Sequence, residues 1–396
     1  MPAPRPTHAT LFLTALRLGC TSFGGPIAHL AYFHEEYVVR QRWLDEESYA
    51  DLVALCQFLP GPASSQVGFG VGLSQRGLTG GLLCWLGFTL PSAILMIGFG
   101  YGVSALGRLS QAGWVHGLNI AAVAVVAQAV GQMGRRLCPD FPRALLAGAA
   151  AALLVVFSAG WAQLAVLAGG AVAGWLWLRP DAGAPIPAAR VPSGPGRATL
   201  VWLFLFAAPL CLLPVLAQVT GRTAWLATGR FYSAGALIFG GGHVILPLLQ
   251  DAMVTPGWIS PDRFLAGYGA AQALPGPLLT FAAYVGTVMS AGPGGWIGGA
   301  WALACVFAPA LLIVLAVLPW WSRLRAHAAT QAALRGANAA VVGLLAAALV
   351  RPIGLNALTG FKEIILAFAA WAALHVPRMP PWAVVAGCAL TGWWLF

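Results

Sequence analysis

Two short runs of glycine and proline interrupt apolar segments early in the chain, and their chemistry suits an anion. Residues 23–26 read FGGP and residues 57–62 read QFLPGP. A Pro-Gly-Pro run removes two amide donors and resists helical continuation, so a new helix begins behind it with unpaired N–H groups. A helix start of this kind carries partial positive charge and favours a negatively charged ligand.

Polar residues beside these breaks supply candidate ligands and proton carriers. Arg17 lies one or two helical turns before the break at residues 23–26, where its guanidinium could bind two oxygens of a tetrahedral oxyanion in a bidentate contact. Anchoring at an interface is the alternative role for Arg17. His29 follows the first Gly-rich run and His243 follows a similar later run. Either histidine could carry a proton near neutral pH, although simple hydrogen bonding is the favoured reading for each.

Ser64, Ser65 and Gln66 follow the first Pro-Gly-Pro, where they either cap the new helix or bind a ligand's oxygens. Glu35 and Glu36 are the carboxylates nearest to the first break, so they are coupling candidates, although a solvated charged loop is preferred. The complete set of candidate substrate-binding residues is Arg17, Ser22, Gly24, Gly25, His29, Gln57, Gly61, Ser64, Ser65, Gln66, Gly241, Gly242, His243, Gln272, Gly276 and Thr280.

The breaks occur twice, which indicates an internal duplication. Residues 239–242 (FGGG) and 272–277 (QALPGP) repeat the two early runs in the same order, at an offset of about 215 residues. Further matched pairs, including Pro91 with Pro309, keep this order while the offset drifts slowly to about 219 residues. Two similar halves are typical of secondary transporters, which move one repeat against the other. In the second copy the residues after Pro277 are more apolar, so the first half is expected to bind more of the substrate.

Composition places these segments in a lipid bilayer. Hydrophobic residues make up 59% of the 396 and charged residues 8%, far below the roughly 25% of a soluble domain. The net charge of +10 is therefore assigned to loops at the inner face of a membrane rather than to nucleic-acid binding. No metal cluster, nucleotide loop or hydrolase motif is present in the sequence, so no cofactor and no enzymatic activity are expected.

The apolar segments predict an all-α polytopic fold of about 13 crossings at roughly 20 residues each. Residues 1–178 form the first repeat, 179–198 a cytoplasmic linker, 199–219 an extra helix and 220–396 the second repeat. Because the extra helix has no counterpart in the first half, it inverts the second repeat. The expected spans are 9–30, 58–75, 78–101, 114–133, 143–158, 161–178, 199–219, 232–250, 275–291, 296–319, 336–350, 360–375 and 380–396.

Charge distribution orients the predicted spans. With the N-terminus in the cytoplasm, the inner loops hold most of the Arg and Lys residues, as the positive-inside rule requires. Residues 48–56 carry apolar side chains at helical spacing and predict an amphipathic helix at the interface, with an equivalent at residues 261–271.

The motifs together resemble the chromate ion transporter family, in its two-domain form. The resemblance rests on SFGGP at residues 22–26, Trp43-Leu44, QFLPGP at 57–62, FGGGHVILP at 239–247 and ALPGP at 273–277. It covers nearly the whole chain. The resemblance implies efflux of chromate across the bacterial inner membrane, chromate resistance, and drive by protons or by the membrane potential.

The leading hypothesis is thus a secondary active chromate exporter. The alternative is a sulfate or other oxyanion permease working inward, because sulfate and chromate are both tetrahedral dianions and sulfate is an expected competitor. A membrane enzyme and a passive channel are the less favoured classes. The oligomeric state stays open, with a homodimer as one option.

Overall fold

The chain is built from helices, as the sequence predicts. The computed structural model describes residues 6–105, 113–157, 160–178, 197–239, 242–321, 327–376 and 379–396. Within these ranges every regular element is a helix and no strand occurs, which confirms the all-α fold class. Gly241 and most of the predicted linker, residues 179–196, lie outside the described residues.

The first part of the chain contains the helices α1 (His8–Thr21), α2 (Gly25–Phe33), the π-helix η1 (His34–Arg40), α3 (Glu46–Phe58), α4 (Ala63–Ala105), α5 (Gly113–Leu137), α6 (Phe141–Val156) and α7 (Gly160–Trp177). The later part contains α8 (Arg197–Thr220), α9 (Thr223–Ala236), η3 (Gly242–Val244), α10 (Ile245–Met253), α11 (Pro261–Gln272), η4 (Leu278–Thr280), α12 (Phe281–Val288), α13 (Gly295–Val317), η5 (Leu318–Trp320), α15 (Ala328–Ala348), η6 (Leu349–Gly354), α16 (Leu355–Ala357), α17 (Phe361–Ala373) and α18 (Pro381–Leu395).

The long helix α4 is two helices joined by a sharp kink. Arg76 and Gly77 have non-helical backbone angles, and Gly77 has a φ of 65°. A Cβ atom at Gly72 would collide with the carbonyl oxygen of Gly80, so the two arms pack backbone to backbone as a hairpin. The kink falls between the predicted spans 58–75 and 78–101.

Helix length and composition fit a protein that crosses a membrane several times. Among the described residues, α4, α5, α8, α13 with η5, and α15 are long and apolar enough to span a bilayer, and shorter apolar helices accompany them. Helix α8 is a clear case, because its most apolar stretch is entirely unburied. An apolar surface of this kind is stable only against lipid or another protein.

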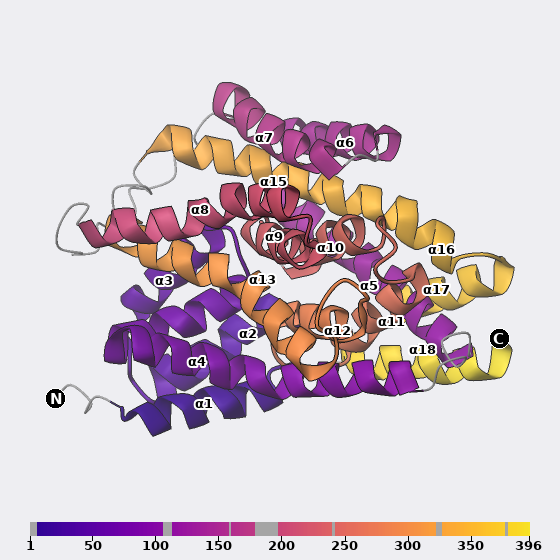
Figure 1. Cartoon of the computed structure of the whole chain (residues 1–396), viewed down its shortest axis with the longest axis horizontal. Helices are drawn as coiled ribbons and strands as arrows, with labels where there is room; N and C mark the ends of the chain where they lie inside the picture. The colour runs from indigo at the N-terminus through magenta and orange to yellow at the C-terminus, as the bar shows by residue number, and fades with distance from the viewer. Residues whose placement is uncertain are drawn as a thin grey trace. The chain divides into compact units, whose positions relative to one another are not determined.

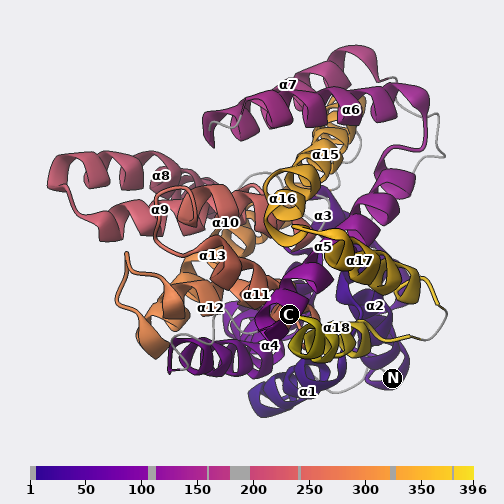
Figure 2. The ribbon, with the colours of Figure 1, turned by 90° about the vertical axis from the view of Figure 1, so that its right-hand side faces the viewer.

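Two compact units divide the chain. Unit 1 contains residues 1–105, 189–242 and 274–320, and unit 2 contains residues 106–188, 243–273 and 321–396. In unit 1, α1 lies along α4, while α9 packs against α8 and α13 (Figure 1). In unit 2, α15 packs against α6 and α7, and α5 packs against α18 and α11 (Figure 2).

Matched glycine contacts occur in both predicted repeats. In unit 1, Gly19 of α1 packs against the backbone of α4, and Gly235, its match in the second half, packs likewise against α13. The α12–α13 hairpin closes where Gly286 meets Gly298, the match of Gly80. The same kinds of side-chain-free contact thus join corresponding helices in the two halves.

Unit 2 pairs helices from opposite halves of the chain. Gly117 of α5 packs against the backbone at Cys388 of α18, and the matched Gly336 of α15 packs against Gly170 of α7. Thus α5 of the first half packs against α18 of the second half, and α15 of the second half packs against α7 of the first half.

The two helices expected at the interface differ. In α3, Tyr49, Leu52 and Cys56 are buried as the spacing predicts, and Val53 is half-buried. In α11 nearly every residue from Phe264 to Ala271 is buried, because its glycines let it pack closely on α5. The prediction of a second interfacial helix was wrong: α11 is a buried helix of unit 2.

Candidate functional site

The two Pro-Gly-Pro breaks are held by a reciprocal pair of hydrogen bonds in unit 1. The Gly61 N–H donates to the carbonyl of Ile238 at 2.6 Å, and the Gly276 N–H donates to the carbonyl of Ser22 at 2.9 Å. Each acceptor stands just before the Gly-rich turn of the other half. The breaks are therefore cross-linked: the Pro-Gly-Pro of each half binds the turn of its counterpart.

Only glycine fits at the centre of each break. Gly61 has a φ of 127° and Gly276 a φ of 91°, which L side chains rarely adopt. A Cβ at Gly276 would lie 2.9 Å from Ser92 Oγ, and one at Gly61 would lie 2.8 Å from the Cβ of Ala310. Ser92 and Ala310 are matched positions of the two halves. The first break therefore packs against α13 and the second against α4, at corresponding positions of the two helices.

Buried polar side chains lie near the first Pro-Gly-Pro break, residues 60–62. His29, 2% exposed, contacts Ser64 with 3.3 Å between Nδ1 and Oγ, and its ring meets the edge of Phe88. The Gln66 amide donates to the carbonyls of Pro60 at 2.8 Å and Ala310 at 3.1 Å, which ties α4 to α13.

Several polar atoms of this cluster have no partner within the described part of the chain. A buried polar atom without a partner costs about 1–3 kcal/mol, so such atoms usually meet water, an ion or a ligand. Those from the first half of the chain, in or near this cluster, are Ser22 Oγ, His29 Nε2, Ser65 Oγ, Gln66 Oε1 and Thr89 Oγ1.

The equivalent positions of the second half are nearly all apolar. The offset pairs the residues Ser22, His29, Ser64, Ser65, Gln66 and Thr89 with Ile238, Ile245, Leu279, Thr280, Phe281 and Phe307 in turn. Thr280 alone keeps a hydroxyl, and that hydroxyl donates to the carbonyl of Pro277 at 2.8 Å. The polar character of the breaks is therefore concentrated in the first half.

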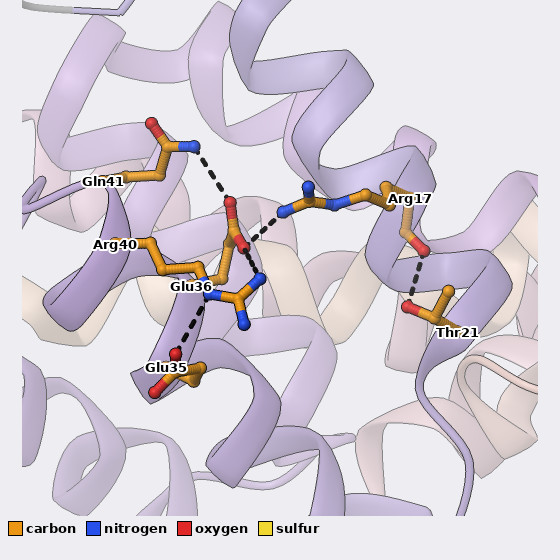
Figure 3. Close-up of polar contacts among 6 residues, drawn as sticks. All are labelled: Arg17, Thr21, Glu35, Glu36, Arg40 and Gln41. Carbon is orange, nitrogen blue, oxygen red and sulfur yellow. Dashed lines mark hydrogen bonds and ion pairs between the residues drawn. The ribbon is translucent and has the colours of Figure 1, made fainter.

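Arg17 and the two acidic candidates form one ion-pair network (Figure 3). The Glu36 side chain, 4% exposed, pairs with the guanidinium of Arg17 and lies 3.9 Å from that of Arg40. Gln41 Nε2 donates to Glu36 Oε1 at 2.9 Å, and Arg40 Nε pairs with Glu35 at 3.0 Å. Arg17 therefore ties α1 to the π-helix η1, and a carboxylate already occupies one side of its guanidinium.

Other predicted residues lie apart from this cluster. Gln57 is exposed, and Gln272 is half-buried beside the Tyr268 hydroxyl in unit 2. His243 also lies in unit 2 and contacts Tyr268, with 3.0 Å between Nδ1 and the hydroxyl. The remaining predicted glycines, Gly24, Gly25 and Gly242, stand at the Gly-rich turns, where the first two have positive φ angles.

Thr89 and Ser92 were missed from the sequence. Both lie within one turn of Pro91, whose match with Pro309 was visible, so a search for hydroxyls around matched prolines would have found them. No group of acidic, cysteine or histidine side chains suited to a metal occurs among the described residues.

Apolar spanning helices, helix breaks cross-linked between two similar halves and a buried polar cluster at one of the breaks define a multi-pass membrane transporter. The profile of the chromate transporter family matches residues 9–175 and 225–393, which lie within the two predicted repeats. The chain belongs to the chromate transporter family.

Curated relatives agree over nearly the full length. A chromate transport protein of Pseudomonas aeruginosa is 30% identical over 99% of this chain and 94% of its own. A chromate transport protein of Cupriavidus metallidurans is 26% identical over 98% and 94%, and a probable chromate transport protein of Synechococcus elongatus is 27% identical over 85% and 82%. No solved structure matches the chain significantly.

Proposed function

We propose that this protein exports chromate across the bacterial inner membrane and thereby confers chromate resistance. The observation that carries the proposal is the set of unpartnered, buried polar atoms at the first break, together with the names of the full-length relatives. Chromate is a tetrahedral dianion with four acceptor oxygens, and it needs several donors at a site shielded from water.

The start of α4 supplies donors of the right kind. Its first backbone-paired amide is that of Gln66, which donates to Pro62, so the amides before it point out of the helix start. The Ser65 hydroxyl on the first turn of α4 and the Ser22 hydroxyl at the end of α1 are buried and unpartnered, and both can donate to a bound oxyanion. In this proposal the dianion binds at the helix start of the first half, and the apolar second half closes over it.

We propose inverted repeats with a cytoplasmic N-terminus. The reciprocal hydrogen bonds of Gly61 and Gly276 support a two-fold relation between the halves, and α8, which has no counterpart in the first half, supplies the odd crossing. Transport would then rock one repeat against the other around the linked breaks.

The energy source proposed is the membrane potential, with proton exchange as a further contribution. Moving one charge across 100 mV is worth about 2.3 kcal/mol, so expelling a dianion from a cell that is negative inside is downhill. Glu35 and Glu36 remain the coupling candidates, because Glu36 is a buried carboxylate in contact with Arg17.

Chromate uptake into everted membrane vesicles tests the proposal. Vesicles containing the protein should accumulate chromate faster than vesicles without it, saturably, with a response to an imposed potential and competition by sulfate. Accumulation only in right-side-out vesicles, with sulfate as the better substrate, would instead favour the inward oxyanion permease. Equal chromate uptake with and without the protein would refute transport of chromate.

A further inference from the structure

Unit 2 contains a cavity that is lined by neither Pro-Gly-Pro break. It has a volume of about 390 Å³ and lies among α6, α7, α10, α15 and the start of α16. Its wall is largely apolar, from Leu154, Val155, Phe157, Leu344 and Leu355. The transport site proposed above uses none of these residues.

A buried glutamine in this wall has an unpaired side-chain amide. Gln250 of α10 is 4% exposed, and neither its amide nitrogen nor its amide oxygen has a partner in the described part of the chain. Leaving both atoms unpaired is costly, so the cavity favours an occupant that accepts a hydrogen bond at its polar end.

Opposite charges line the same cavity. Arg351, which is exposed, and Asp251, which follows Gln250 on α10, both line it. Arg351 leaves helical geometry, with φ −136° and ψ 125°, inside the π-helical segment η6 and just before Pro352. Thr255, also a lining residue, donates its Oγ1 hydroxyl to Asp251 Oδ1 at 3.4 Å.

This combination excludes a small dianion as the natural occupant. Asp251 would repel a second negative charge, and the apolar wall would remain uncovered by a small hydrated ion. A ligand that fits must combine an anionic group for Arg351 and Gln250, a cationic donor for Asp251 and an apolar chain for the rest.

We propose that the cavity binds a zwitterionic phospholipid with a primary ammonium headgroup. The phosphodiester accepts hydrogen bonds from Arg351 and the Gln250 amide, and the ammonium donates to Asp251. An acyl chain covers Leu154, Leu344 and the neighbouring apolar side chains, as the bilayer setting of these helices allows. The lipid would join α10 to α6 and α15, so it would stabilise unit 2.

The test measures lipid binding to the purified full-length protein by native mass spectrometry, together with its thermal stability in detergent. The probes are phosphatidylethanolamine, phosphatidylcholine and phosphatidylglycerol with identical acyl chains. Phosphatidylcholine keeps the charges but lacks the N–H donors, and phosphatidylglycerol lacks the cation. Phosphatidylethanolamine should bind best and give the largest rise in melting temperature.

Two variants and a matched control locate the effect. Arg351→Gln should weaken phosphatidylethanolamine binding about 10- to 100-fold, the range expected for a lost hydrogen bond to a charged group. Asp251→Asn should remove the preference for phosphatidylethanolamine over phosphatidylcholine. Lys362→Gln, an exposed cation of unit 2 outside the cavity, should change neither.

The proposal is overturned if the three lipids bind equally, if phosphatidylglycerol binds best, or if Lys362→Gln weakens binding as much as Arg351→Gln. Protection of the protein by inorganic sulfate that requires Arg351 would also overturn it, because it would make the cavity an ion site. Should Arg351→Gln fold poorly, Gln250→Leu offers a second route. It removes the unpaired amide without removing charge, and it should raise the stability of lipid-free protein while weakening lipid binding.

Discussion

Gly276→Ala tests the cross-linked breaks most sharply. The substitution forces a side chain into a φ of 91° and places a Cβ 2.9 Å from Ser92 Oγ and 3.3 Å from the Gly19 carbonyl oxygen. The backbone strain costs about 1–2 kcal/mol and the crowding about 1–3 kcal/mol, so a total of about 2–5 kcal/mol is expected. The strain should also weaken the hydrogen bond from the Gly276 N–H to the Ser22 carbonyl, which joins the second Pro-Gly-Pro to the residue before the first Gly-rich turn.

Gly77→Ala is the matched control. Gly77 also has a positive φ, 65°, with ψ −157°, a backbone region essentially confined to glycine. A Cβ there meets no atom within 4 Å, so backbone strain of about 1–3 kcal/mol applies without crowding. The fraction of protein that stays folded in detergent after heating, followed by size-exclusion chromatography, ranks the variants without requiring reversible unfolding.

Gly276→Ala should lose folded protein at a lower temperature than Gly77→Ala, and Ser92→Ala should restore part of the difference by removing the nearest contact. Equal stability of the two glycine variants, or wild-type transport by Gly276→Ala, would refute the reasoning that these breaks are tightly packed against each other.

Substitutions at three further positions test single side chains. If Arg17 also binds two oxygens of the oxyanion, Arg17→Lys should fail to restore the transport lost in Arg17→Ala, because an ammonium cannot make that bidentate contact. Normal transport by both variants would mean that Arg17 only pairs with Glu36. Ser22→Ala should leave stability unchanged or raise it by about 1 kcal/mol, since its hydroxyl has no partner, yet it should weaken chromate binding in an equilibrium dialysis experiment. Asp45→Ala should cost about 1 kcal/mol by removing the α3 cap on the Ser48 N–H. That hydrogen bond lowers the pKa of Asp45 in the folded state, so the cap's contribution is present above the ordinary carboxyl pKa and is lost as pH falls through the lowered value; stability curves of Asp45→Ala and wild type should converge in acid.

Apolar runs of about 20 residues located most of the long helices, because lipid imposes an apolar composition on them. The predicted spans 9–30 and 232–250 each correspond to two helices, α1 with α2 and α9 with α10. The kink at Arg76 and Gly77 was visible as a polar, glycine-containing gap between two apolar runs. The linked breaks were recognisable as pairs, but an offset shows only which residues correspond. The offset does not show that Gly61 binds Ile238, before the Gly-rich turn of the second half, rather than the turn of the first half. That choice depends on how the two halves fold together.

Other features depended on contacts that no local pattern carries. A break separates Arg17 from Glu36 in the sequence, and their ion pair depends on how α1 and the π-helix η1 pack in the folded chain. Helix α11 was expected at an interface because residues 261–271 correspond to residues 48–56, but Gly269 permits close approach to Leu118 and the helix is buried.

The most direct test of the account compares Ser65→Ala with Thr280→Val in chromate uptake by everted vesicles. The two positions correspond, yet the Ser65 hydroxyl is unpartnered while that of Thr280 is bonded to Pro277. If chromate binds at the first break, Ser65→Ala should raise the half-saturating chromate concentration about tenfold, the effect of roughly 1.4 kcal/mol, and Thr280→Val should leave it near the wild-type value. Equal effects of the two substitutions, a larger effect of Thr280→Val, or no chromate uptake by the wild type would contradict the account.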